Sequence, residues 1–115
     1  MILQNTLFAP QSSWSVPDVF PQFSETETVA IDLETYDPHL TTCGPGWATS
    51  CGHVVGVGVA TKHWTGYFPI RHEGGGNLDE GIVLRWLTYL LNYTKRDVIF
   101  HNALNDVGLL RREGI

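Results

Sequence analysis

An apolar, partly β-branched run that ends in two acids constrains the fold of this chain more than any other feature. Val29-Ala30-Ile31 is typical of a buried strand, and Asp32 and Glu34 follow at its end. Because residues two apart in a strand point to the same face, both carboxylates face one spot. Buried acids repel each other unless a hard cation with oxygen ligands neutralises them. The pattern indicates either a divalent metal site or a strand that simply ends in polar residues at a loop.

The other predicted elements follow from apolar periodicity. Short apolar runs predict strands, the second and third of them joined as a hairpin by a short link, and apolar residues at helical spacing predict helices. The expected strands are 29–34, 53–61, 64–70 and 98–100, and the expected helices are one opened by Asp79 and Glu80 and one over 103–112. The first helix carries a core stripe of Ile82, Val83, Trp86, Leu87, Leu90 and Leu91. The order β-β-β-α-β-α predicts an α/β fold with a mixed sheet and flanking helices.

The connections are rich in Pro and Gly. Residues 1–28 are expected to be an extended lead-in that Trp14 and Phe20 attach to a domain over 29–115. Residues 35–52 are expected to be a loop of turn formers, and residues 73–77 a flexible connection. The alternating glycines of 53–61 predict that another element approaches one face of that strand closely.

Composition narrows the classes of function. The chain has 115 residues, enough for one small domain, and its formal net charge is -5. This charge argues against a broad basic surface for nucleic acid, so any contact with nucleic acid is expected at a local site where metal ions screen the phosphates. No apolar run approaches the length of a membrane span, and no secretory signal is visible. We therefore expect a cytoplasmic protein without membrane contact.

The two cysteines allow two other interpretations. Cys43 and Cys51 could pair, but a chain without a secretory signal is expected in a reducing compartment, where both stay free. Together with His53 and His63 they could bind zinc, although their spacing matches no familiar zinc motif. Free cysteines in and beside a loop are the simpler interpretation.

A second polar constellation lies where the fourth strand leads into the last helix, at His101-Asn102-Ala103-Leu104-Asn105-Asp106. Asn102 and Asp106 are four apart and would share one face of a helix. Taken alone, Asn102 reads as an N-cap and Asp106 as part of an ordinary polar helix face. Taken with Asp32 and Glu34, Asp106 completes three acids from two strand ends. Such a set is typical of a cage for two cations about 3.5–4 Å apart that promotes phosphoryl displacement.

These residues resemble the motifs of the DEDD proofreading nucleases. Asp32-Leu33-Glu34 is similar to the first exonuclease motif, Asp-x-Glu, and residues 102–106 to the second, Asn-x-x-x-Asp. The closest likeness is to the 3′–5′ exonuclease domain of family A DNA polymerases, especially those of bacteriophages, and it covers roughly residues 18–115. Other similar segments are 31–35, 44–47, 67–70, 75–78 and 101–103. The resemblance implies a ribonuclease-H-like fold, two Mg²⁺ or Mn²⁺ ions, and a single-stranded DNA 3′ end as substrate in an infected bacterial cell.

The resemblance also implies roles at the matching positions. Asp32 would bridge both metals, Glu34 would bind one and orient the terminal nucleotide, and Asp106 would hold the second. Asn102 would support that geometry through hydrogen bonds. Substrate-side roles are implied for three neighbours of these residues: Leu33, Thr35 and His101.

The match has one departure. A third motif, Tyr-x-x-x-Asp or His-x-x-x-x-Asp, is expected downstream of Asp106, yet the chain ends at Ile115, after the second core helix. Tyr36 and Tyr89 do not sit in such a motif. Two hypotheses follow. In the first, the chain is part of an exonuclease that is weak or inactive alone and is completed by a polymerase or exonuclease fragment in trans, or by a second copy. In the second, it is a non-catalytic module that binds DNA or a polymerase. A missing last strand would expose a sheet edge beside the fourth strand, which predicts a homodimer or a partner chain.

Overall fold

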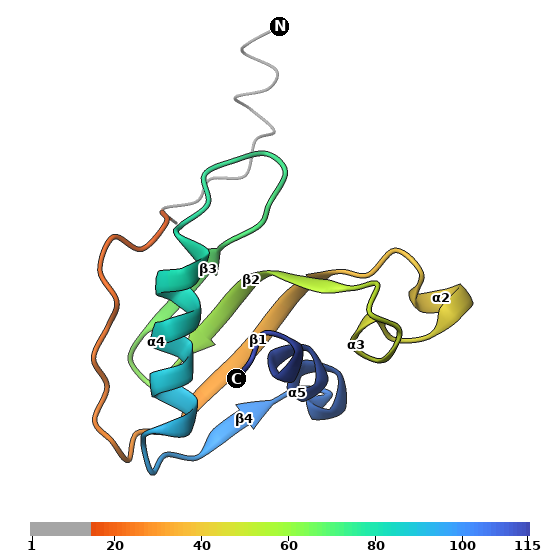
Figure 1. Ribbon diagram of the computed structural model, residues 1–115. Coiled ribbons are helices and arrows are strands. Elements are labelled where there is room, and N and C mark those ends of the chain that lie inside the picture. Colours follow the sequence, from red (N-terminus) through yellow and green to blue (C-terminus); the bar gives the residue numbers. More distant parts are fainter. Residues whose placement is uncertain (1–14) are drawn as a thin grey trace, which may run out of the picture.

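The sheet organises the structure, a computed structural model in which residues 15–115 are described (Figure 1). Its strands are β1 (Val29–Tyr36), β2 (His53–Ala60), β3 (Thr65–Pro69) and β4 (Val98–Phe100). The spatial order is β3-β2-β1-β4, with β1–β2 and β2–β3 antiparallel and β1–β4 parallel. This confirms the predicted hairpin and the mixed sheet. It also places β4 at an edge of the sheet.

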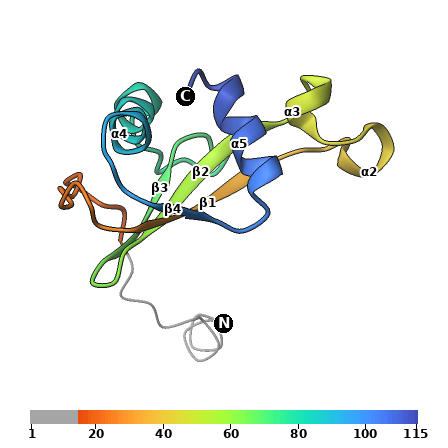
Figure 2. The ribbon, with the colours of Figure 1, turned by 90° about the horizontal axis from the view of Figure 1, so that it is seen from below.

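Two longer helices cover one face of this sheet. They are α4 (Glu80–Asn92) and α5 (Ala103–Arg112), and both lie on the same side (Figure 2). The fold is therefore the expected α/β class with flanking helices, and it is compatible with a ribonuclease-H-like fold. No helix in the part of the chain that is described covers the opposite side, which we call the open face of the sheet.

Alternation along the strands separates the core from the open face. The core lies between the sheet and the helices, and its buried residues are Val29, Ile31, Leu33, Val54, Val57, Val59, Phe68, Ile70, Val83, Leu87, Leu90, Leu109 and Leu110. In β1 the residues between these apolar positions are Ala30, Asp32 and Glu34, which point the other way. The apolar pattern that forms the strand therefore also turns both acids to the open face.

Helix α4 follows from its sequence. The Asp79 side chain caps the first turn by accepting a hydrogen bond from the Ile82 N–H at 2.9 Å, as its position predicts. Val83, Leu87 and Leu90 are buried against the sheet. Ile82 was predicted to belong to the core stripe and does not, because it is 46% exposed.

The lead-in packs on the domain through aromatic rings. Phe20 stacks on Phe68 with ring centroids 5.3 Å apart, and the Trp86 indole N–H donates to the Pro21 carbonyl at 3.3 Å. The role predicted for Phe20 is thus confirmed. Trp14 lies outside the described residues.

The segment after β1 differs from the prediction. The strand continues to Tyr36, and the predicted loop contains two four-residue helices, α2 (Leu40–Cys43) and α3 (Gly46–Thr49). The Asp37 carboxylate holds this segment by accepting the Gly46 N–H at 2.8 Å. Such short helices carry no apolar stripe and depend on tertiary contacts, so periodicity does not reveal them. None of the described helices is long and apolar enough to cross a bilayer.

Candidate functional site

Asp32 and Glu34 lie on the open face, each directly beside a glycine of β2. Asp32 pairs with Gly58 and Glu34 with Gly56. Both acids are exposed, whereas Leu33 between them is only 7% exposed and packs in the core. A ligand on the open face therefore meets the two carboxylates but only the main chain of Leu33. Thr35 follows a register shift in the strand and is half-buried.

Asp106 reaches the same region from the first turn of α5. Strand β4 ends at Phe100, opposite Ile31, so Asp32 has no strand neighbour on that side. Asp106 is only 5% exposed, and its Oδ2 has no hydrogen-bond partner among the described residues. Burial, together with the nearby negative charge of Asp32, raises the pKa of Asp106 to about 6, against a smaller opposing effect of His101. Asp32 and Asp106 are therefore close enough to repel each other.

Asn102 does not share a helical face with Asp106. It occupies the N-cap position of α5 with φ 56° and ψ 59°, a left-handed conformation, and its side chain makes no capping hydrogen bond. The predicted N-cap position of Asn102 is therefore confirmed, but its side chain does not cap the helix. A non-glycine residue with positive φ is uncommon, although Asn tolerates it best, and such positions cluster at functional sites. His101 beside it is exposed.

Of the three acids, Asp32 and Asp106 lie close together, and Glu34 does not join them in one cluster. The described residues contain no group of three or more His, Cys, Asp or Glu side chains that could hold a metal ion. This finding also covers the zinc interpretation, and both cysteines are free and exposed. An unpartnered, buried carboxylate oxygen beside a second carboxylate nevertheless fits one hard divalent cation, which would relieve both the burial and the repulsion.

Sequence reasoning missed Tyr67, which lies near Glu34, and its neighbour His72. Tyr67 Oη is 2.5 Å from His72 Nε2, and burial together with the charge of Glu34 raises the pKa of Tyr67 above its usual value. A side chain on Gly56 would overlap the Tyr67 ring and hydroxyl. This is the close approach that the alternating glycines predicted, and those glycines were the one signal in the sequence that could have located Tyr67.

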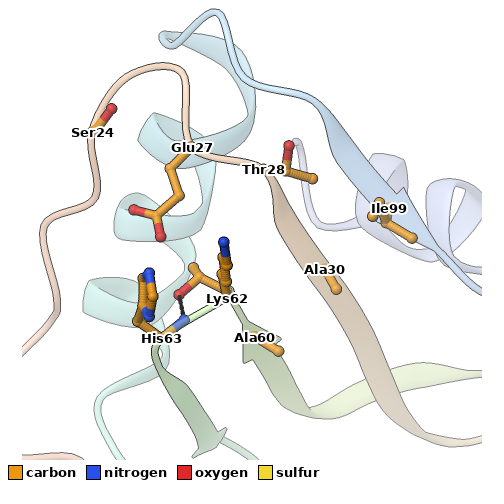
Figure 3. A pocket seen from close by; sticks show the side chains of 9 residues that line it. Ser24, Glu27, Thr28, Ala30, Ala60, Lys62, His63 and Ile99 are labelled. Atoms are coloured by element: carbon orange, nitrogen blue, oxygen red, sulfur yellow. Dashed lines mark hydrogen bonds between the residues drawn. The ribbon is translucent and has the colours of Figure 1, made fainter.

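The open face is also hollowed. One pocket lies between the end of the lead-in and the sheet, where Glu27 faces Lys62 and His63 above a floor of small residues (Figure 3). A second hollow shares Ala30, Ala60 and Ile99 with it, and reaches Asp32 and His101. The apolar floor therefore continues from the corner with Glu27 and Lys62 to the candidate site. Neither hollow was predicted from the sequence.

Comparison with known proteins gives one informative similarity. No protein-family model matches the chain. The chain is 38% identical over 118 residues to a DNA-directed DNA polymerase of Pseudomonas phage M6, in an alignment that covers 98% of this chain. That alignment covers 18% of the polymerase, so the chain spans less than a fifth of the length of this relative. The expected likeness to a bacteriophage DNA polymerase is confirmed for one segment of such a protein. The narrower likeness to its exonuclease domain stays a prediction.

Proposed function

We propose that this chain is part of a metal-dependent 3′–5′ exonuclease that belongs to a phage DNA polymerase and removes nucleotides from a single-stranded DNA end. The observation that carries the proposal is the buried, unpartnered carboxylate of Asp106 beside Asp32. A protein keeps such a destabilising pair when the pair has a function. The similarity to a phage DNA polymerase over nearly the whole chain supports the same function and an infected bacterial cell as its location.

The roles follow from placement. Asp32 and Asp106 would hold a first Mg²⁺ or Mn²⁺, and Glu34, on the same face two residues along β1, would serve a second. When bound, the cations would stabilise the negative charge that develops as the terminal phosphodiester is hydrolysed. His101, exposed where β4 leads into α5, would face the incoming phosphate. The left-handed Asn102 would set the start of α5, and with it the position of Asp106.

A second candidate is a binding or assembly module without catalysis. It is favoured by the finding that no three potential metal ligands gather in the described part of the chain. In this case the open face would bind single-stranded DNA or another part of a polymerase, and hydrolysis would need groups supplied in trans.

The deciding experiment combines metal binding with nuclease activity. The purified chain is melted with and without Mn²⁺, and is incubated with 3′-labelled single-stranded DNA in Mn²⁺ or EDTA. Mn²⁺ is expected to raise the melting temperature of the wild type, because a ligand that binds only the folded state stabilises it. Asp32→Ala should lose this response. Glu73→Ala, which removes an exposed loop acid, is the matched control and should keep it.

The nuclease arm separates the two candidates. Stepwise release of nucleotides that requires Mn²⁺ and falls at least about a hundredfold in Asp32→Ala supports the exonuclease, since misplaced reacting groups lose rate on this scale. DNA binding without release supports the module. If Mn²⁺ shifts the melting temperature equally in the wild type and in Asp32→Ala, the proposed metal site at Asp32 is contradicted, whichever of the two functions the chain has.

A further inference from the structure

Three strands bring Tyr67 and the two acids of β1 to one part of the open face. Asp32, Gly58 and Tyr67 pair in a line across β1, β2 and β3, and Glu34 pairs with Gly56 in the neighbouring line. Both β2 positions between the acids and β3 are glycines. No side chain therefore stands between the acids and the aromatic ring of Tyr67.

The Tyr67 ring leans out of the row that it forms with Gly58 and Asp32, toward the neighbouring row of Gly56 and Glu34. A Cβ added at Gly56 would overlap the hydroxyl and the outer ring atoms of Tyr67, so the hydroxyl lies directly above Gly56. Because Gly56 is the cross-strand partner of Glu34, the hydroxyl lies beside the Glu34 position. Tyr67 is half-buried.

A chain of hydrogen bonds holds the phenol there. Tyr67 Oη lies 2.5 Å from His72 Nε2. His72 is held in turn by Asn77, whose side chain accepts the His72 N–H at 2.8 Å and donates to the His72 carbonyl at 2.8 Å. Residues 73–77 were expected to be a flexible connection. Asn77, the last of them, is bonded back to the His72 main chain, and the His72 ring contacts the Tyr67 hydroxyl.

We propose that Tyr67, held by His72 and Asn77, is a positioning residue for Glu34. The phenol restricts the Glu34 carboxylate to the orientation in which it serves the cation site, and Gly56 is glycine because any side chain there would displace the phenol. This inference deepens the proposed function and rests on it for the role of Glu34. Groups that contact a metal ligand without touching the metal, and so orient that ligand, usually contribute about tenfold or more to metal affinity.

The test follows the Glu34 carboxyl carbon by NMR in the full chain labelled with ¹³C-carboxyl glutamate. The Glu34 signal is the one that disappears in Glu34→Gln. Tyr67→Phe, which removes only the hydroxyl, is expected to shift this signal and to weaken Mn²⁺ binding about tenfold in calorimetry. Gly56→Ala, which keeps the hydroxyl but displaces it, should give the same two effects. Tyr93→Phe, at a tyrosine that is 73% exposed beyond α4, should give neither.

The outcomes separate this inference from the proposed function. An unmoved Glu34 signal in folded Tyr67→Phe and Gly56→Ala overturns the positioning role, whatever the metal does. A shifted signal in a protein whose Glu34 resonance is not broadened by Mn²⁺ supports the contact and contradicts the metal site. If Tyr67→Phe does not fold, Gly56→Ala and His72→Ala decide by the same shift.

Discussion

Asp106 lies in an environment that opposes the ionised form of its carboxyl group. Its carboxyl is buried, one oxygen lacks a partner among the described residues, and Asp32 adds repulsion. An unpaired buried charge is destabilising, so ionising Asp106 weakens the fold. Stability given up at one buried acid is typical of a functional site.

This argument predicts the effect of Asp106→Asn. The pKa of Asp106 rises from 3.8 to about 6 on folding, so the folded state binds the proton more tightly and stability falls as the pH rises between these values. At pH 7 the difference corresponds to up to about 3 kcal/mol. Asp106→Asn should therefore melt at a higher temperature than the wild type at pH 7 and lose this advantage near pH 4.

Melting curves across this pH range check the prediction. Asp97→Asn, at an exposed acid in the turn before β4, is the control and should leave the pH dependence unchanged. If Asp106→Asn melts at a lower temperature than the wild type at neutral pH, ionised Asp106 does not destabilise the folded state.

At the scale of elements, Arg71 connects three parts of the fold just after β3. Its guanidinium binds both carboxylate oxygens of Glu113, at 2.5 and 2.9 Å, and reaches Glu80 at 2.9 Å and the Val54 carbonyl at 3.0 Å. The side chains of Arg71 and Glu113 are 23% and 14% exposed. A bidentate, mostly buried pair of this kind is stronger than a surface ion pair. It ties the end of α5 to β2 and to the start of α4.

Arg71→Ala should lower the free energy of unfolding by about 2–3 kcal/mol, because it leaves the buried carboxylate of Glu113 unpaired. Arg85→Ala, at an exposed arginine of α4, should change it by less than about 0.5 kcal/mol. Urea denaturation of the two variants measures both values. Equal free energies of unfolding for Arg71→Ala and Arg85→Ala would show that the Arg71 contacts do not stabilise the fold.

The same pair adds a pH dependence of opposite sign to that of Asp106. The Arg71 hydrogen bonds hold the pKa of Glu113 below its usual value. The stability that this contributes is present above the ordinary glutamate pKa and is lost as the pH falls through the lowered one. Glu113→Gln should therefore reduce the acid-induced loss of stability, and acid unfolding followed by circular dichroism measures this effect.

At the scale of the whole molecule, the described sheet has one face covered by helices and β4 at one of its edges. Both longer helices lie on one side, and β4 is paired only with β1. The exposed Ile99 lies in this edge strand and forms part of the apolar floor of both hollows on the open face. Unpaired edges next to apolar surface favour strand addition by another chain.

We therefore expect self-association that increases with protein concentration in light scattering. Ile99→Lys should reduce it, since a charge on an edge strand opposes pairing. Ile82→Lys, at a similarly exposed isoleucine on α4, should not. A protein that stays monomeric at all concentrations would contradict pairing of two copies through this edge.

Local pattern was sufficient for much of this fold. Short apolar runs and helical spacing identified the four strands and the two longer helices that the structure describes, because such patterns are read within a few residues. It was also sufficient to turn Asp32 and Glu34 to one face. The pattern failed for α2 and α3, whose short helices have no apolar stripe, and for Ile82, whose exposure depends on how α4 sits on the sheet.

Only the tertiary structure decided which distant groups meet. The early end of β4 lets Asp106 approach Asp32, and the left-handed backbone at Asn102 starts α5 where it does. Cross-strand register places Tyr67 over Gly56 beside Glu34. The sequence by itself determined the elements and the direction of each acid because these depend on neighbours along the chain. Burial, register and charge coupling depend on residues far apart in it, so they appear only when the sheet and helices are assembled.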